Sequence, residues 1–338
     1  MASCDVVGEQ HLGYILDPSQ CKYDPTLDVN VLCVADGGTN ATSSCLAVEQ
    51  AEAVNKIWYG ATVDGTVPAP RVDLGWSPTL SSMQKWYGLP RGAPVNGPPF
   101  SIGDESGPFG IASDITALIL QDPTIATPSF QNATGNGANN WKLLSYEQLM
   151  DAFDRGLALQ SAFADVDANN PNLTAFRARG RKLIIYQGLA DQIIAPQGTI
   201  RYYNEVIGKM GGLAATQKFF RLFLTPGWGH AACTPTETNQ CITGTANAVF
   251  PRASDDDYYN AVVDWVEKGI APDQFVGRTS SADLVTRSQP ICAYPKKAVY
   301  RGRDPNIAAS YRCKRVSWKN GDADDDDGRR RDDDDEDD

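Results

Sequence analysis

The chain has few histidines, no long apolar run and no excess of positive charge. Only two of its 338 residues are histidine. No stretch of eighteen consecutive apolar residues occurs, so we expect no transmembrane helix. The formal net charge is −12 and there is no basic patch, which argues against nucleic acid as a partner. The sequence therefore disfavours membrane-spanning proteins and nucleic-acid-binding proteins.

Much of the acidity lies at the C-terminal end. Residues 319–338 hold twelve Asp or Glu side chains against four Lys or Arg, which gives them a net charge of −8. Nothing in this stretch is apolar enough to fold, and its like charges repel one another. We predict a disordered acidic tail over residues 317–338. A cation-binding role and an error in the gene model are the alternatives.

The cysteines point to an oxidising compartment. None of the eight stands in a CxxC motif, and only two histidines are available to complete a zinc site, so a disulfide framework fits better than zinc. Sequons at Asn40, Asn132 and Asn172 fit a secreted protein. No apolar secretory segment follows Met1, so we expect the signal peptide to lie upstream. The cysteines are Cys4, Cys21, Cys33, Cys45, Cys233, Cys241, Cys292 and Cys313.

The first half of the chain is rich in Gly, Pro, Asn and Ser. Over residues 1–170 we find short helical stretches and no sustained strand pattern. The helices expected there cover residues 45–60, 113–123 and 145–163, with Ser113 or Asp114 capping the second and Ser145 at the start of the third.

From residue 175 the pattern becomes an alternation of strands and helices. "LIIY" (183–186) is a short apolar run before a Gly-bearing turn, typical of a buried parallel strand, and "FFRLFL" (219–224) is the next strand. Strand–helix–strand–helix order with short turns predicts a parallel α/β unit. The expected helices cover 196–212, closed by Gly211–Gly212, and 257–275, with Ala261, Val262, Trp265 and Val266 on one face.

A polar residue follows each of the two predicted strands. Asp191 comes just after the first and His230 lies in the "PGWGH" turn after the second. Adjacent parallel strands lie about 4.8 Å apart, so the two side chains can meet, in the Asp-then-His order of α/β-hydrolases. A carboxylate that fixes an imidazole makes it a base for a hydroxyl nucleophile. The alternatives are a turn or N-cap role for Asp191 and a surface role for His230. We interpret His11, in a polar loop, as a surface residue.

At these residues the sequence resembles the tannase/feruloyl esterase family of secreted serine esterases. The likeness covers about residues 3–313 and includes the element "DPSQCKYDP" (17–25), the acid turn "YQGLAD" and the histidine turn. The stretches that carry it are 4–25, 45–60, 173–206, 219–233, 261–279 and 287–313.

The resemblance implies a partial α/β-hydrolase fold with a large irregular lid. Residues 1–170 would be the lid and residues 171–316 the C-terminal part of the catalytic domain. Asp191 would be the triad acid and His230 the base, acting on small phenolic or aromatic carboxylic esters. The implied disulfides are Cys4–Cys21, Cys33–Cys45 and Cys292–Cys313.

The sequence departs from the family pattern in three places. It contains no G-x-S-x-G elbow, because the serine of "GDESG" (103–107) is out of register; we expect the nucleophile upstream of Met1. Two alanines separate His230 from Cys233, so Cys233 is expected to pair with Cys241. The family's calcium-binding aspartates are reduced to Asp5, with Glu9 as a weak substitute, so we expect no cofactor and no strong calcium site.

The function predicted is therefore a carboxylic ester hydrolase with a Ser-His-Asp mechanism, inactive as this chain alone. One alternative is a non-catalytic paralogue that binds a phenolic ligand. The other is a gene-model fragment that does not fold alone, because a parallel sheet without its first strands exposes an open edge. The aromatic side chains that could stack on a phenolic ring are Trp58, Trp76, Trp86, Trp141 and Tyr87.

Overall fold

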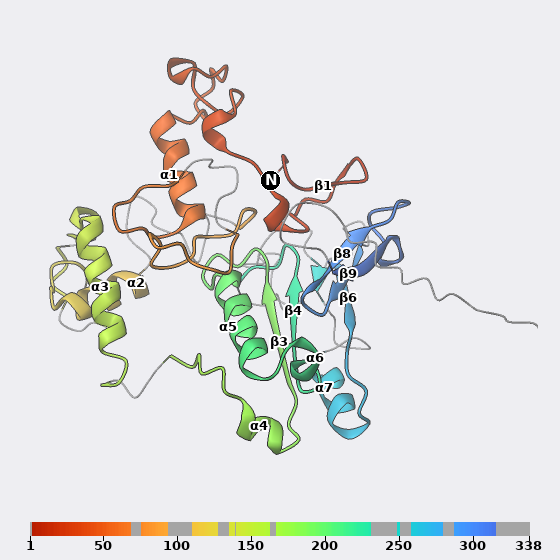
Figure 1. Cartoon of the computed structure of the whole chain (residues 1–338). Coiled ribbons are helices and arrows are strands. Elements are labelled where there is room, and N and C mark those ends of the chain that lie inside the picture. The colour runs from red at the N-terminus through yellow and green to blue at the C-terminus, as the bar shows by residue number, and fades with distance from the viewer. Residues whose placement is uncertain are drawn as a thin grey trace, which may run out of the picture.

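The computed structural model describes residues 2–68, 76–93, 110–127, 135–138, 140–162, 167–230, 249–250, 258–279 and 287–315. We define the N-terminal part as residues 2–162; its described residues form one very short hairpin, helices and irregular loops. The C-terminal part, residues 167–315, contains the longer strands. In Figure 1 the helices α1 (Val48–Tyr59) and α3 (Tyr146–Ala158) lie to the left of these strands.

The N-terminal part is built from short helices joined by turns. Its described elements are β1 (Val6–Val7), β2 (Gln10–His11), the 3₁₀ helices η1 (Pro18–Gln20), η2 (Pro25–Leu27), η3 (Val34–Asp36) and η5 (Asn140–Leu143), α1, α2 (Gly110–Leu120) and α3. The helices expected over 45–60 and 145–163 are present. Ser145 caps α3, because its hydroxyl accepts the Gln148 N–H at 3.1 Å.

The second helix begins earlier than predicted. α2 starts at Gly110, so the expected cap at Ser113 or Asp114 is wrong. Ser113 lies within the first turn, where its hydroxyl donates to the Gly110 carbonyl. A serine hydroxyl can accept a backbone N–H as a helix cap, or it can donate to the carbonyl three or four residues earlier from within a helix. A serine in the sequence therefore does not by itself mark the start of a helix.

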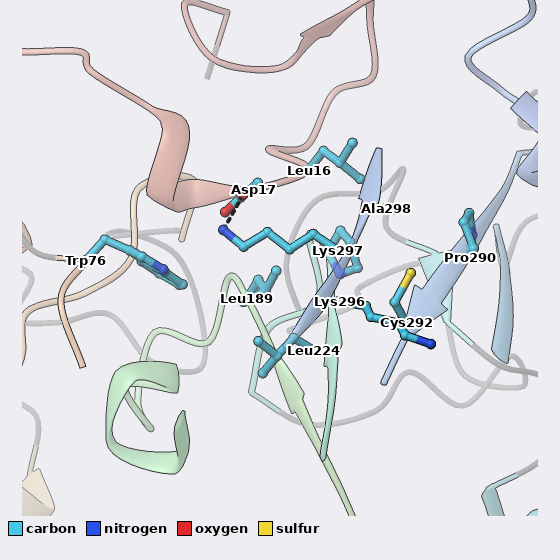
Figure 2. Close-up of a pocket in the computed structure, with 11 residues that line it drawn as sticks. Leu16, Asp17, Trp76, Leu189, Leu224, Pro290, Cys292, Lys296, Lys297 and Ala298 are labelled. Atoms are coloured by element: carbon cyan, nitrogen blue, oxygen red, sulfur yellow. Dashed lines mark hydrogen bonds and ion pairs between the residues drawn. The ribbon is translucent and has the colours of Figure 1, made fainter. Parts of the chain in front are cut away.

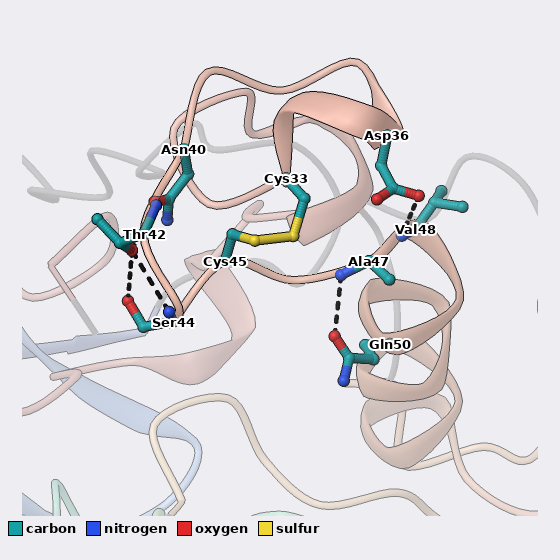
Figure 3. Close-up of a disulfide and its surroundings, with 9 residues drawn as sticks. All are labelled: Cys33, Asp36, Asn40, Thr42, Ser44, Cys45, Ala47, Val48 and Gln50. Carbon is teal, nitrogen blue, oxygen red and sulfur yellow. Dashed lines mark hydrogen bonds between the residues drawn. A yellow bond between two sulfur atoms is a disulfide. The ribbon is translucent and has the colours of Figure 1, made fainter.

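A disulfide fixes the start of α1. Cys33 and Cys45 are joined over a sequence separation of 12, and the loop between them carries η3 (Figure 3). Ala47 precedes α1 and has no side chain that can cap it. The Asp36 carboxylate accepts the Val48 N–H at 3.3 Å instead. The covalently closed loop therefore places a negative charge at the positive end of the helix.

The C-terminal part centres on two parallel strands. β3 (Leu183–Gly188) and β4 (Phe220–Thr225) pair in parallel, with Leu183 opposite Phe220 and Gly188 opposite Thr225. The helices α5 (Pro196–Lys209) and α6 (Leu213–Thr216) connect them, so the predicted strand–helix–strand order is confirmed. Within the described part of the chain, β4 is the sole strand paired with β3.

Antiparallel strands complete the C-terminal part. β5, β6 and β7 form one sheet and β8 and β9 another. The Tyr294 N–H, just after β7, donates to the Leu222 carbonyl of β4 at 2.8 Å, which joins these strands to the parallel pair. The remaining elements are α4 (Thr174–Ala178), β5 (Val249–Phe250), α7 (Tyr258–Glu267), β6 (Gln274–Thr279), β7 (Ser288–Cys292), β8 (Lys296–Tyr300), η6 (Ala308–Ser310) and β9 (Tyr311–Arg315).

β4 is buried on both of its faces. Phe220 and Leu222 pack with α5, where the Tyr203 ring meets Phe220 edge-on at 4.8 Å between centroids. Phe223 points to the other face and meets Phe275 of β6 at 4.6 Å. Full burial of such a side chain contributes roughly 1.5–3 kcal/mol. This strand is therefore the core of the C-terminal part and holds the end of β3 in place.

The helix predicted over 257–275 is shorter in the structure. α7 ends at Glu267, Gly269 follows with a φ of +73°, and β6 begins at Gln274. The predicted apolar face is also only partly right, because Trp265 is 3% exposed but Val266 is 59% exposed. Residues 274–279 form a strand because β7 pairs with them antiparallel. That partner is distant in sequence, so local spacing cannot reveal it.

The first residues of the chain pack against its last strands. Leu12 and Tyr14 are fully buried, and the Arg287 guanidinium donates to the Leu12 carbonyl. Lys297 of β8 forms an ion pair with Asp17 at 2.6 Å. These contacts attach the start of the N-terminal part directly to the C-terminal part. None of the described helices is both long and apolar enough to cross a bilayer.

Candidate active site

The ends of β3 and β4 bring two loops together. The Ala190 N–H, in the loop after β3, donates to the Trp228 carbonyl, in the loop after β4, at 2.9 Å. A Cβ atom at Gly188 would lie 2.1 Å from that same carbonyl oxygen, so the approach requires glycine. The carboxyl ends of parallel strands are where α/β proteins place functional groups.

Asp191 and His230 lie in these two loops and contact each other. His230 Nδ1 is 3.2 Å from Asp191 Oδ1 and 3.3 Å from Asp191 Oδ2. The Asp191 side chain is 7% exposed and that of His230 is 35% exposed. A buried carboxylate therefore supports an imidazole that reaches the surface.

Backbone and side-chain donors hold the Asp191 carboxylate. Its Oδ1 accepts the N–H groups of Ile193 and Ile194 at 2.9 and 2.8 Å. Its Oδ2 accepts the Gln187 Nε2–H at 2.9 Å. A buried charge is costly unless donors satisfy it. These three donors satisfy the carboxylate and orient its plane.

The histidine turn is held from three sides. Its Gly227 has a φ of +67°, and a Cβ there would lie 2.6 Å from Tyr14 Cβ. The Trp228 ring stacks on Tyr186 of β3 with centroids 5.4 Å apart. The His230 N–H donates to Gln192 Oε1 at 3.2 Å. The N-terminal part, β3 and the Asp191 loop thus all position the imidazole.

This arrangement supports proton transfer by the imidazole. A carboxylate at Nδ1 favours the tautomer that carries its proton there, which leaves the lone pair on Nε2. Such a ring can take a proton from a hydroxyl and return it to a leaving group. The structure shows the contact, and the catalytic roles of Asp191 and His230 stay predictions.

The predicted disulfides are present where the structure describes them. Cys4–Cys21, Cys33–Cys45 and Cys292–Cys313 are all bonded. Cys233 and Cys241, the Asn132 sequon and the acidic tail over 317–338 lie outside the described residues.

Asp5 contacts His11, a partner that was not predicted from the sequence. The carboxylate is buried, with Oδ1 2.7 Å from His11 Nδ1 and Oδ2 accepting the Gly13 N–H at 3.0 Å. His11 is exposed, as expected of a surface residue. Calcium needs six to eight oxygen ligands, whereas both oxygens of Asp5 face N–H donors. Within the described ranges no three His, Cys, Asp or Glu side chains converge, and the absence of a strong calcium site at Asp5 stays a prediction.

A small cavity lies beside the dyad without containing it. Its volume is about 40 Å³, and Trp76, Leu189 and Leu224 are among its lining residues. Figure 2 shows Lys297 reaching across it to Asp17. A space of this size suits water, not a phenolic ring. The cavity is therefore a packing feature next to the site.

Most of the aromatic candidates for ligand stacking are engaged in packing. Trp76 and Tyr87 are buried. The Trp58 ring meets Tyr23 at 6.2 Å and has the Arg91 guanidinium 4.9 Å above it. Trp141 packs against a small buried cluster of Ala117, Ile125 and Ala126, while Trp86 is 45% exposed. This pattern favours structural roles over an aromatic binding platform.

The side chains that support the dyad were not predicted from the sequence. Gln187, Gln192 and Trp228 all contact the Asp191 or His230 loop. The one available signal was position, because Gln187 is a polar residue within an otherwise apolar strand, four residues before Asp191.

Comparison with known proteins decides the family. The family model described as "Tannase and feruloyl esterase" matches residues 1–314. The chain belongs to this family. A probable feruloyl esterase of Arthroderma benhamiae is 30% identical over 321 residues, which cover 93% of this chain and 51% of that protein. The chain thus spans about half the length of the curated relatives it matches.

Solved structures of this family share the fold. The crystal structure of feruloyl esterase B from Aspergillus oryzae matches 92% of this chain and 54% of its own, with a TM-score of 0.64 and 23% identity. The tannin acyl hydrolase from Aspergillus niger matches 92% and 51%, with a TM-score of 0.64 and 20% identity. At these identities the likeness concerns the fold alone.

Proposed function

We propose that this chain carries the acid and the base of a carboxylic ester hydrolase with a Ser-His-Asp mechanism. One observation carries the proposal: the His230 imidazole meets the Asp191 carboxylate at the ends of adjacent parallel strands. Membership of the tannase and feruloyl esterase family supports it. In this proposal Asp191 orients the ring and stabilises its protonated form, and His230 moves the proton.

The reaction follows from these roles. A serine hydroxyl gives its proton to His230 as its oxygen attacks the ester carbonyl. Collapse of the tetrahedral intermediate expels the alcohol, which takes the proton from His230. Water then attacks the acyl-enzyme by the same route and releases the carboxylic acid, so that ester and water become acid and alcohol.

The substrates proposed are esters of phenolic or aromatic acids. The names of the relatives, feruloyl esterase and tannin acyl hydrolase, support this class. We further propose that residues 1–170 are a lid and that the protein is secreted. Three disulfides and an exposed sequon at Asn172 support secretion.

The serine is proposed to come from a segment outside this chain. The sequence contains no G-x-S-x-G motif, and the relatives are about twice as long as the matched region. A triad without its nucleophile retains only residual activity. We therefore expect the chain alone to hydrolyse esters at the background rate.

The test is to assay methyl ferulate and methyl gallate with this chain and with a chimaera. In the chimaera the chain follows the first half of Aspergillus oryzae feruloyl esterase B. We expect turnover by the chimaera alone, and its inhibition by phenylmethylsulfonyl fluoride. In the chimaera, His230→Ala should lower kcat by at least ~10⁴-fold.

The matched control is His11→Ala, which removes the other histidine and should leave kcat unchanged. A folded chimaera that hydrolyses neither ester contradicts the proposal. So does a His230→Ala chimaera that retains its activity.

A further inference from the structure

We infer that Gln187 is a positioning residue that holds Asp191 in register with the His230 ring. The inference rests on the proposed function, because it assigns a role within the same acid–base pair. Gln187 is the next-to-last residue of β3 and only 9% exposed. A buried amide on a strand that is otherwise apolar costs stability unless its polar atoms are bonded.

The neighbours of the Gln187 amide fix which end faces Asp191. Nε2 is 2.9 Å from Asp191 Oδ2 and 3.3 Å from the Ile194 carbonyl. Both of these atoms can only accept, so the NH₂ group must point to them. On the other side, Gln187 Oε1 accepts the Thr199 hydroxyl at 3.0 Å. The amide therefore has one orientation and donates to the carboxylate.

The same bonds connect the site to a rigid element. Thr199 lies in the first turn of α5, which packs on β3 and β4 through the core. The chain of contacts runs from Thr199 through Gln187 to Asp191 and then to His230. Sites supported by helices and strands are held more accurately than sites on loops alone.

Gln187 complements the backbone donors of the Asp191 loop. The N–H groups of Ile193 and Ile194 both donate to Oδ1. The Gln187 amide, in contrast, donates to Oδ2. Without Gln187 the backbone donors still hold Oδ1, but Oδ2 keeps only the longer 3.3 Å contact with His230 Nδ1 among the described residues, so the carboxylate can turn about Oδ1. His230 Nδ1 is nearly equidistant from the two oxygens, so such a turn weakens the contact that sets the tautomer of the ring.

Nuclear magnetic resonance of the chain itself tests the inference. The ring nitrogens of its two histidines, labelled with ¹⁵N, report each neutral tautomer by chemical shift, and His11→Asn assigns the signals. The measurement is made at a pH well above that at which histidine protonates. We expect His230 to carry its proton on Nδ1 in the wild-type chain.

Gln187→Met keeps the length of the side chain and removes its polar atoms. We expect it to lower the ratio of Nδ1–H to Nε2–H tautomer at His230 by about tenfold, the effect of losing one hydrogen bond to a charged group. Thr199→Val, a milder change of similar shape, should shift the ratio in the same direction by less. If Gln187→Met does not fold, Thr199→Val is the variant that tests the inference.

The control is Gln217→Met, which deletes another bond from a side-chain amide, to the Tyr294 carbonyl at 3.0 Å. Both glutamine variants should lower thermal stability, but only Gln187→Met should move the tautomer ratio. An unchanged ratio in folded Gln187→Met or Thr199→Val overturns the inference. Failure of the chimaera to hydrolyse esters, with the tautomer shift still present, overturns the proposed function and leaves the positioning role standing.

Discussion

At the scale of single residues, Gly188 sets the distance between the loops that carry Asp191 and His230. A Cβ there would lie 2.1 Å from the Trp228 carbonyl oxygen, and backbone atoms cannot yield as a flexible side chain can. We expect Gly188→Ala to lower the free energy of unfolding by about 3 kcal/mol. It should also separate His230 from Asp191. Urea unfolding and the His230 ring shifts measure the two effects.

Gly208→Ala provides the matched control. Gly208 lies in α5, is exposed, and has no atom within 4 Å of a Cβ built on it. The same substitution should therefore raise stability by about 0.5–1 kcal/mol. Equal destabilisation by both variants would show that the close approach at Gly188 has no special role.

The two principal site residues could be found from sequence, but their supports could not. Asp191 and His230 follow apolar runs that are recognisable as strands, and strand order brings such positions together. Gln187 occupies a position inside a strand, where a polar residue usually indicates a solvent-facing side chain. The Asp5–His11 contact depends on a hairpin of two-residue strands, which is too short to show a period.

At the scale of elements, the loop closed by Cys33 and Cys45 supports α1. Because a disulfide stabilises mainly by restricting the unfolded chain, a loop of this length contributes about 3 kcal/mol. We expect Cys33→Ser combined with Cys45→Ser to lower the free energy of unfolding by that amount. It should also release Asp36 from the Val48 N–H and fray the first turn of α1. Urea unfolding and amide hydrogen exchange of α1 measure these effects.

Asp36→Ala separates the cap from the covalent bond. It removes only the carboxylate at the helix start and should cost about 1 kcal/mol. A disulfide variant that is no less stable than Asp36→Ala would show that the loop contributes through the cap alone.

Elements with strong local signals were predicted well. α3 has a capping serine and a regular apolar spacing, and β3 and β4 are short apolar runs before turns. The helix over 257–275 was extended too far because residues 274–279 become a strand only by pairing with β7. α2 was started too late because its beginning at Gly110 bears no capping signal.

At the scale of the whole molecule, buried tyrosines couple stability to high pH. Burial raises the pKa of Tyr311 to about 12, and raises the pKa values of Tyr14 and Tyr203 further. The folded chain therefore holds these protons above pH 10, where the unfolded chain loses them. Their contribution to stability is full below pH 10 and falls as the pH rises through 12.

We expect the free energy of unfolding to fall steeply above pH 10. Urea unfolding at pH 8, 10 and 11, with tyrosinate absorbance, follows it. Tyr203→Phe removes one titrating group and should make the fall shallower, although at neutral pH it costs the bond to the Phe220 carbonyl. If all 13 tyrosines ionise together near pH 10 while the chain stays folded, the prediction is wrong.

The attachment of the chain's beginning to its end was beyond sequence reasoning. Arg287 and Leu12 are 275 positions apart, and Lys297 and Asp17 are 280 apart. Neither pair belongs to a recognisable motif. The sequence alone does not distinguish an arginine or lysine that bonds a distant residue from one that faces solvent. These contacts hold Tyr14 against Gly227 of the histidine turn, so the N-terminal part helps to position that turn.

The pairing of β3 with β4 determines the edge at which the parallel sheet can be extended. Among the described residues β3 pairs with β4 along one edge only, and backbone donors and acceptors on its other edge can pair with a further strand. Every parallel strand that lengthens the sheet that way finishes at the rim where Asp191 and His230 stand. In the proposed mechanism, a serine that follows such a strand would lie at the same rim as His230, so that extending the sheet would also bring the serine to the imidazole.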